Sequence, residues 1–197
     1  ILSHTSGNAD KLRSVCRFLF SNVGRVTNAE RISAELKLSD DTVRKYLDAL
    51  LEAHLFYHAE RYDIVGKNVF RSKGKYYATD TGMRNLLVNA NELRDISAPL
   101  ENIVFFELLR RGWRVFVGSY RDKEVDFIAI REDEIRYYQV SQTIMAEETY
   151  SREIGPLKAI GDNYPKTILT LDRFGLGNDS GIRTINLIDW LMGRIDA

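Results

Sequence analysis

Apolar residues recur at helical spacing in three segments near the start of the chain. Lys11–Asn22 carries them on one side and ends near Asn22 and Gly24, and Asn28–Leu36 is a shorter predicted helix with Asn28 as its N-cap. After the turn KLSD, Asp40–Ala53 places Val43, Tyr46, Leu47, Leu50 and Leu51 on one face. Two short helices joined by a tight turn predict a helix-turn-helix.

Strand-like segments follow these helices. Leu55–Tyr62 is rich in aromatic residues, Asn68–Arg71 follows a glycine-containing turn, and the basic turn Ser72–Lys75 precedes KYYATD. Three helices followed by a β-wing predict a winged helix over residues 1–95. Helical spacing then resumes in Asp80–Val88.

The second half of the chain has a different pattern. Ile96–Leu100 contains Pro99 and marks the expected boundary, and Leu100–Gly112 is a predicted helix. Three β-prone segments separated by polar turns then predict an antiparallel meander: Trp113–Val117, Glu124–Ile130 and Ile135–Ser141.

The remaining elements complete this second domain. Glu147–Ile160 is a predicted helix that Gly155 and Pro156 should break or kink. Lys166–Leu171 and Ile182–Asn186 are predicted strands, and a helical turn at Asp189–Gly193 should bury Trp190. The order α-β-β-β-α-β predicts a restriction-endonuclease-like domain over residues 98–197. The fold class is therefore a two-domain combination of α+β and α/β.

Charge and cysteine content limit the partners and the cellular compartment that we expect for this chain. Residues 1–97 hold 15 basic and 12 acidic residues, a net charge of +3, and residues 98–197 hold 13 and 16, a net charge of −3. The single cysteine, Cys16, excludes an internal disulfide and favours the cytoplasm. No apolar run approaches the roughly 20 residues that span a membrane. The start at Ile1 rather than Met suggests a fragment.

Basic and polar residues of the first domain form a candidate nucleic-acid surface. Reading helices touch bases with polar residues near their N-terminus, and cations contact phosphates. The candidates are Ser39, Thr42, Arg44 and Lys45 in the third helix and Lys67, Arg71, Lys73 and Lys75 in the wing. The same helix exposes four acids, and winged helices also bind proteins. DNA and a protein both remain candidate partners.

Residues of the second domain can be matched to a metal-dependent nuclease site. That chemistry needs a helix acid, an aspartate on one strand and an acid–x–lysine pair on the next, so that carboxylates hold Mg²⁺. The matching positions are Glu101, Asp126, Gln139 and Ser141. Gln139 lacks the acid's charge and Ser141 is too short to replace lysine. Lys123 is a candidate substitute for that lysine, but strand parity with Asp126 puts it on the opposite face.

The three histidines, His4, His54 and His58, show no metal-ligand spacing, so the weak metal candidates are Glu101 and Asp126. Mg²⁺ or Mn²⁺ would be required only if this site is active. The residues therefore predict a nuclease-like domain without ordinary nuclease activity.

Several segments, in this order, carry a resemblance to a known family: LKLSDDTVRKYLDALLEAHLFYHAERYD, KGKYYATDTGMRN, LENIVFFELLRRGWRVFVG, KEVDFIAI, YYQVSQT and YPKTILTLD. The chain resembles the C-terminal region of prokaryotic AAA-type ATPases, in which a P-loop ATPase domain precedes a winged helix and a restriction-endonuclease-like domain. The resemblance implies ATP and Mg²⁺ in a parent chain and the missing ATPase domain as a partner. No G-x-x-x-x-G-K-[ST] motif occurs here, so ATP hydrolysis is not assigned to these residues.

Three functions are consistent with these features. The first is a non-catalytic accessory region that engages DNA or a protein, and it is the function that Gln139 and Ser141 favour. The second is a Mg²⁺- or Mn²⁺-dependent nuclease with an altered site. The third is a structural or oligomerising domain.

Overall fold

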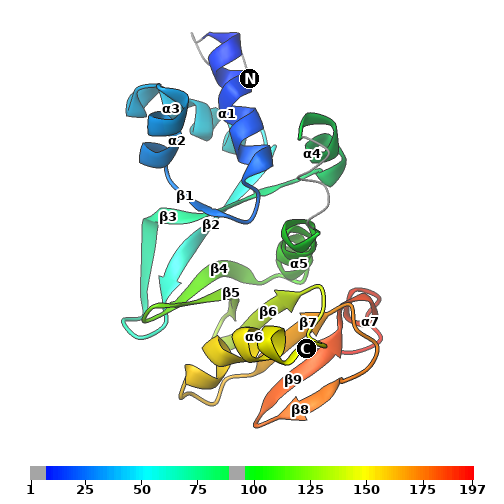
Figure 1. Ribbon diagram of the computed structural model, residues 1–197. Coiled ribbons are helices and arrows are strands. Elements are labelled where there is room, and N and C mark those ends of the chain that lie inside the picture. The colour runs from blue at the N-terminus through cyan, green and yellow to red at the C-terminus, as the bar shows by residue number, and fades with distance from the viewer. Residues whose placement is uncertain (1–7, 89–95) are drawn as a thin grey trace. The chain divides into compact units, whose positions relative to one another are not determined.

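The computed structural model describes residues 8–88 and 96–197, and the chain divides into two units (Figure 1). The first unit takes in Ile1–Glu60 and Arg71–Asn102, and the second takes in Arg61–Phe70 and Ile103–Ala197. The two units are interleaved along the sequence, because the segment at the tip of a hairpin belongs to the second unit.

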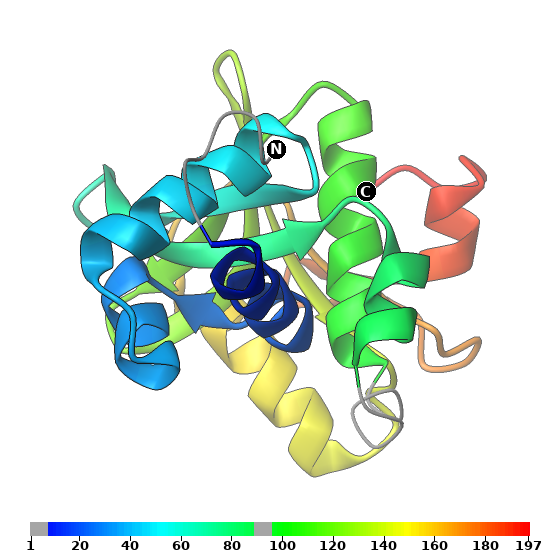
Figure 2. The ribbon, with the colours of Figure 1, turned by 90° about the horizontal axis from the view of Figure 1, so that it is seen from above.

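Three helices, a short strand and a hairpin make up most of the first unit. The elements are α1 (Ala9–Ser21), β1 (Val26–Thr27), α2 (Ala29–Leu36), α3 (Asp40–Glu52), β2 (Phe56–Asp63), β3 (Asn68–Ala78) and α4 (Thr81–Leu87). Asn8, Asn28, Ser39 and Asp80 each cap a helix by accepting a backbone N–H, which confirms Asn28 as an N-cap. Figure 2 shows α1 nearly along its axis with α2 and α3 beside it.

A small antiparallel contact completes this unit. Val26 of β1 pairs with Lys75 of β3, and Thr27 pairs with Gly74. A side chain at Gly74 would place its Cβ 2.2 Å from the carbonyl oxygen of Ala59. Only glycine allows the backbone to approach so closely.

The second unit is a mixed sheet with helices on both faces. Its elements are the second half of α5 (Ser97–Arg110), β4 (Arg114–Tyr120), β5 (Lys123–Arg131), β6 (Glu134–Ser141), α6 (Glu147–Ala159), β7 (Lys166–Thr170), β8 (Gly177–Asp179), β9 (Ile182–Asn186) and α7 (Leu187–Leu191). The strand order is β4-β5-β6-β7-β9-β8, and the last residues of β2, Arg61–Asp63, pair in parallel with the outer side of β4.

Strand directions follow the sequence expectation in the centre of this sheet. β4, β5 and β6 are antiparallel neighbours, which confirms the predicted meander. β6, β7 and β9 run parallel to one another. The parallel step from β6 to β7 is made through α6, as such a crossover requires.

An irregularity interrupts β5. Phe116 of β4 pairs with Ile128 and Gly118 pairs with Val125, so Val117 alone stands opposite both Asp126 and Phe127. This two-against-one arrangement is a β-bulge, and it reverses the alternation of side chains along the strand. As a result Val125 and Ile128, three residues apart, both belong to the apolar cluster that α6 covers.

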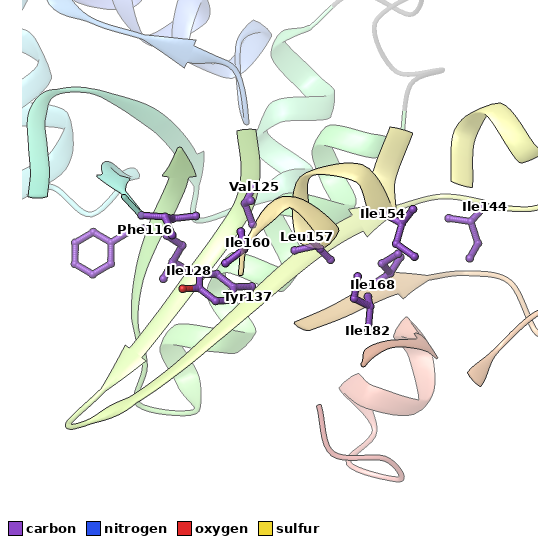
Figure 3. Close-up of a cluster of buried hydrophobic side chains, with 11 residues drawn as sticks. Phe116, Val125, Ile128, Tyr137, Ile144, Ile154, Leu157, Ile160, Ile168 and Ile182 are labelled. Carbon is purple, nitrogen blue, oxygen red and sulfur yellow. The ribbon is translucent and has the colours of Figure 1, made fainter. Parts of the chain in front are cut away.

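That apolar cluster is the main core of the second unit. Ile154 and Leu157 of α6, with Ile160 just after it, point toward Ile168 and Tyr137 of the sheet, together with the β5 residues just named (Figure 3). On the other face the rings of Phe105 and Phe127 lie 6.2 Å apart, as do those of Tyr138 and Trp190. The predicted burial of Trp190 is confirmed.

α6 runs as one helix through Gly155 and Pro156, so of the predicted break or kink, the break is wrong. A proline inside a helix costs about 3 kcal/mol. Ile154 and Leu157 flank this point and are both buried, and each contributes roughly 1.5–3 kcal/mol. Their combined burial is large enough to offset the proline.

Two further differences concern element boundaries. α5 begins at Ser97, before Pro99, because proline fits the first turn of a helix where its missing N–H is not needed. β8 was not expected, since its sequence GND has little strand propensity.

Among the described residues, the structure contains no helix with the length and hydropathy required to cross a membrane.

Candidate functional site

Asp126, Gln139 and Glu153 form a buried polar cluster where β5, β6 and α6 meet. Gln139 lies on β6, two residues from Tyr137, so both side chains face α6. Its amide nitrogen donates to the Glu153 carboxylate at 2.9 Å, and its amide oxygen accepts the backbone N–H of Asp126 at 3.3 Å. Both ends of the Gln139 carboxamide are therefore engaged inside the protein.

Asp126 closes the other side of the same junction. Its carboxylate accepts the backbone N–H of Val140 at 2.9 Å. The regular pairing of β5 with β6 ends at Phe127 and Tyr138, just where the bulge begins. Beyond this point side chains replace the backbone hydrogen bonds between the strands. Gln139 of β6 accepts a backbone N–H of β5, and Asp126 of β5 accepts a backbone N–H of β6.

Glu153 was not among the residues predicted for the site. It is 7% exposed, and its second oxygen accepts Arg152 Nε at 3.0 Å and Arg152 Nη2 at 2.8 Å. A buried carboxylate requires such compensation. The sequence did hold a signal, since Glu153 precedes Leu157 by one helical turn and so interrupts the apolar stripe of α6.

Ser141 stands apart from this cluster in its bonding. The side chain is buried at the end of β6, and its hydroxyl donates to the carbonyl of Thr143 at 2.9 Å. The hydroxyl thus stabilises the turn after β6. Position 141 supplies no cation to the site.

A cleft of about 430 Å³ opens beside the cluster. Its lining comes from β5, β6 and α6: Lys123, Glu124, Gln139, Ser151, Arg152, Glu153, Gly155 and Pro156. Lys123 shares this cleft with Gln139, and Asp126 is not in its lining, so Lys123 lies on the face opposite Asp126, as strand parity predicted. The pairing of β5 with β4 is regular from Lys123 to Val125, and the bulge begins only at Asp126 and Phe127.

Glu101, the predicted helix acid, belongs to the first unit, whereas Asp126, Gln139 and Ser141 belong to the second. Its carboxylate lies 3.0 Å from Lys75 Nζ and 3.4 Å from the Tyr77 hydroxyl. The side chains of Lys75 and Glu101 are 4% and 16% exposed. Glu101 is therefore half of a buried ion pair.

This pair also corrects the predicted nucleic-acid surface. Lys75 is buried and cannot reach a phosphate, so its prediction as a nucleic-acid-binding residue is wrong. Ser39 caps α3 and bonds Thr42, and Arg44 pairs with Glu30. Lys45, Lys67 and Lys73 are exposed, and Arg71 lies on β3 with its side chain outside the description.

Within residues 8–88 and 96–197, no three histidine, cysteine, aspartate or glutamate side chains converge closely enough to hold a metal ion. The chemistry that the cluster can perform is hydrogen bonding, and the cleft adds an ammonium, a guanidinium and two carboxylates at its wall.

The chain is similar to proteins and to a domain family whose descriptions give no activity. Residues 2–94 match a family described as a domain of unknown function, DUF8612. The chain is 41% identical over 198 residues to an "Uncharacterized protein" of Haemophilus influenzae, covering 97% of this chain and 48% of that protein. It is 28% identical over 189 residues to "Uncharacterized protein MJ1544" of Methanocaldococcus jannaschii, covering 90% of this chain and 40% of that protein.

The chain therefore spans about half the length, or somewhat less, of the curated relatives that it matches. No solved structure matches it at a significant level.

Proposed function

We propose that this chain is the C-terminal accessory region of a prokaryotic, cytoplasmic ATPase, and that it binds DNA without cutting it. In this proposal a winged helix precedes a restriction-endonuclease-like domain whose catalytic site is no longer complete. The observation that carries it is the Gln139 carboxamide, which is held at both ends between Asp126 and Glu153.

The bonding of Gln139 explains why cleavage is not expected. A metal-dependent nuclease needs converging carboxylates and a nearby cation. Gln139 is neutral and its amide nitrogen faces the buried Glu153 carboxylate, which favours a donor at this place over a metal ligand. Ser141 offers no ammonium, and losing one preorganised transition-state donor typically costs about 10²–10³ in rate.

Exposed cations support DNA as the partner. Lys45 on α3 and Lys67 and Lys73 of the β2–β3 hairpin are exposed, so they can approach phosphates. The curated relatives extend well beyond the matched region, which leaves space in those proteins for an ATPase domain. A G-x-x-x-x-G-K-[ST] motif in the gene upstream of Ile1 would support the ATPase context, and a parent chain without one would refute it.

A plasmid assay tests the absence of cleavage. Supercoiled plasmid incubated with the protein and Mg²⁺ or Mn²⁺ should stay intact. The double variant Gln139→Glu/Ser141→Lys restores the acid–x–lysine pair, and Gln139→Glu/Ser141→Ala is its matched control. Nicking by the wild type that disappears in Asp126→Ala would refute the proposal.

Binding is tested separately. Fluorescence anisotropy of labelled duplex DNA at low and moderate salt should show an affinity that falls as salt rises. No binding even at low salt would exclude DNA and leave a protein as the partner.

The second candidate is a nuclease with an altered site. It is favoured by the presence of Lys123, Glu124 and Glu153 around one cleft, which gives the cleft a lysine and two carboxylates. The same plasmid assay decides between the two candidates, because only this one predicts metal-dependent nicking by the wild type.

A further inference from the structure

Lys123 lies at the wall of the cleft beside the polar cluster. It precedes Val125 by two residues and so shares its side of the strand, which is the side that α6 covers. Its Nζ lies 3.5 Å from the carbonyl oxygen of Gly155 on α6. Gly155 has no side chain there, so the ammonium lies against the α6 backbone at the cleft.

Three cations of α6 and β7 are engaged by acids. Arg152 binds Glu153, Lys158 binds Asp179 and Lys166 binds Asp162. Within the described part of the chain, Lys123 forms no ion pair, and its one hydrogen bond is the long one to Gly155. An exposed ammonium in this situation keeps most of its donor capacity for a ligand.

The donors of the cleft indicate the chemical class of that ligand. Besides Lys123, the lining includes the Ser151 hydroxyl and the Arg152 guanidinium, of which the latter uses two of its five N–H groups on Glu153. Glu153 is paired with Arg152, and Glu124 is the other carboxylate in the lining. Donors of this kind suit the oxygens of a phosphate, with Glu124 limiting the strength of the contact.

We infer that Lys123 contacts a phosphate of bound nucleic acid in this cleft, in the role that a lysine at position 141 would have in an intact acid–x–lysine pair. This inference rests on the DNA binding proposed above and assigns one phosphate contact to the second unit. It does not require cleavage, because an ammonium attracts phosphate whether or not a metal is present.

The experiment measures the anisotropy of a fluorescein-labelled oligonucleotide, single-stranded and duplex, with the full chain over a range of salt. Lys123→Gln should weaken binding several-fold and lower the salt slope by about 1, as expected for loss of one phosphate contact. Lys158→Gln is the matched control, since it removes the same charge from α6 of the same unit outside the cleft lining. Lys123→Arg should retain the wild-type slope.

Each outcome has a distinct meaning. If the wild type binds and Lys123→Gln behaves like the wild type or like Lys158→Gln, the Lys123 contact is refuted while DNA binding stands. If the wild type does not bind at low salt, both proposals are refuted. Displacement of the oligonucleotide by polyglutamate at equal charge concentration would show a contact with any anion and would also overturn a phosphate-specific role.

Discussion

Removing either partner of the buried Lys75–Glu101 pair should destabilise the first unit strongly. Breaking a buried ion pair by removing one partner costs about 3–5 kcal/mol, since the remaining charge stays away from water. The Lys75 side chain is 4% exposed and that of Glu101 is 16% exposed, and the Tyr77 hydroxyl lies near the carboxylate. Glu101→Leu should therefore cost more than Lys75→Met, with the latter near the lower end of that range.

The assay is a thermodynamic cycle. Urea unfolding followed by circular dichroism compares the wild type, Lys75→Met, Glu101→Leu and the double variant. The double variant should lose less than the sum of the single losses, because it leaves neither charge in the interior.

Two results would refute this reasoning. Losses under about 1 kcal/mol that add in the double variant would mean that the pair has the small effect of a surface salt bridge. A rise in melting temperature with Mg²⁺ or Mn²⁺ that Glu101→Leu abolishes would make Glu101 a metal ligand, as the nuclease pattern first suggested.

Three other substitutions test neighbouring features. Gln139→Glu places a second carboxylate against that of Glu153, which lies 2.9 Å from the amide nitrogen of Gln139 in the wild type. Because two adjacent carboxylates repel when both are charged, the free energy of unfolding of this variant should fall as pH rises past about 4.3. Gln139→Met, followed in the same urea titrations, should lack this pH dependence. Hydrogen bonds from Lys158, then Ser180 and Tyr150, lower the pKa of Asp179 from 3.8 to about 2. Asp179→Asn should therefore lower the melting temperature above pH 3.8, with the difference from the wild type disappearing as pH falls to about 2; a constant difference would refute this role. Pro156→Ala restores an N–H to α6 and should raise the free energy of unfolding by up to about 3 kcal/mol, seen as a higher midpoint in urea. A lower midpoint would mean that the proline is needed where it stands.

Regular periodicity let the sequence predict the helices and the meander, and it failed wherever the backbone departed from regularity. The bulge at Asp126 and Phe127 adds one residue to β5 without a distinctive sequence, and it brings Val125 and Ile128, three residues apart, to the same face. α6 continues through Pro156 because the apolar contacts of Ile154 and Leu157, visible only once the sheet is built, outweigh the local preference.

The residues of the candidate site also fall into those that the sequence could predict and those that it could not. Asp126 and Gln139 could be predicted as neighbours because they lie on adjacent strands, and they do bond. Predicting Glu153 as part of the site required knowledge of which α6 residue faces β6. A lysine is usually a surface cation, and the burial of Lys75 became evident only from its ion pair with Glu101.

The interleaving of the two units bears on recombinant fragments of this chain. Arg61–Asp63 of β2 pair with Val117, Gly118 and Ser119 along the outer side of β4. A fragment that starts at Ala98 would lack this strand and would expose the backbone donors and acceptors of β4. Unpaired strand edges of this kind recruit other chains. The fragment should therefore associate or precipitate at concentrations where the whole chain stays in solution.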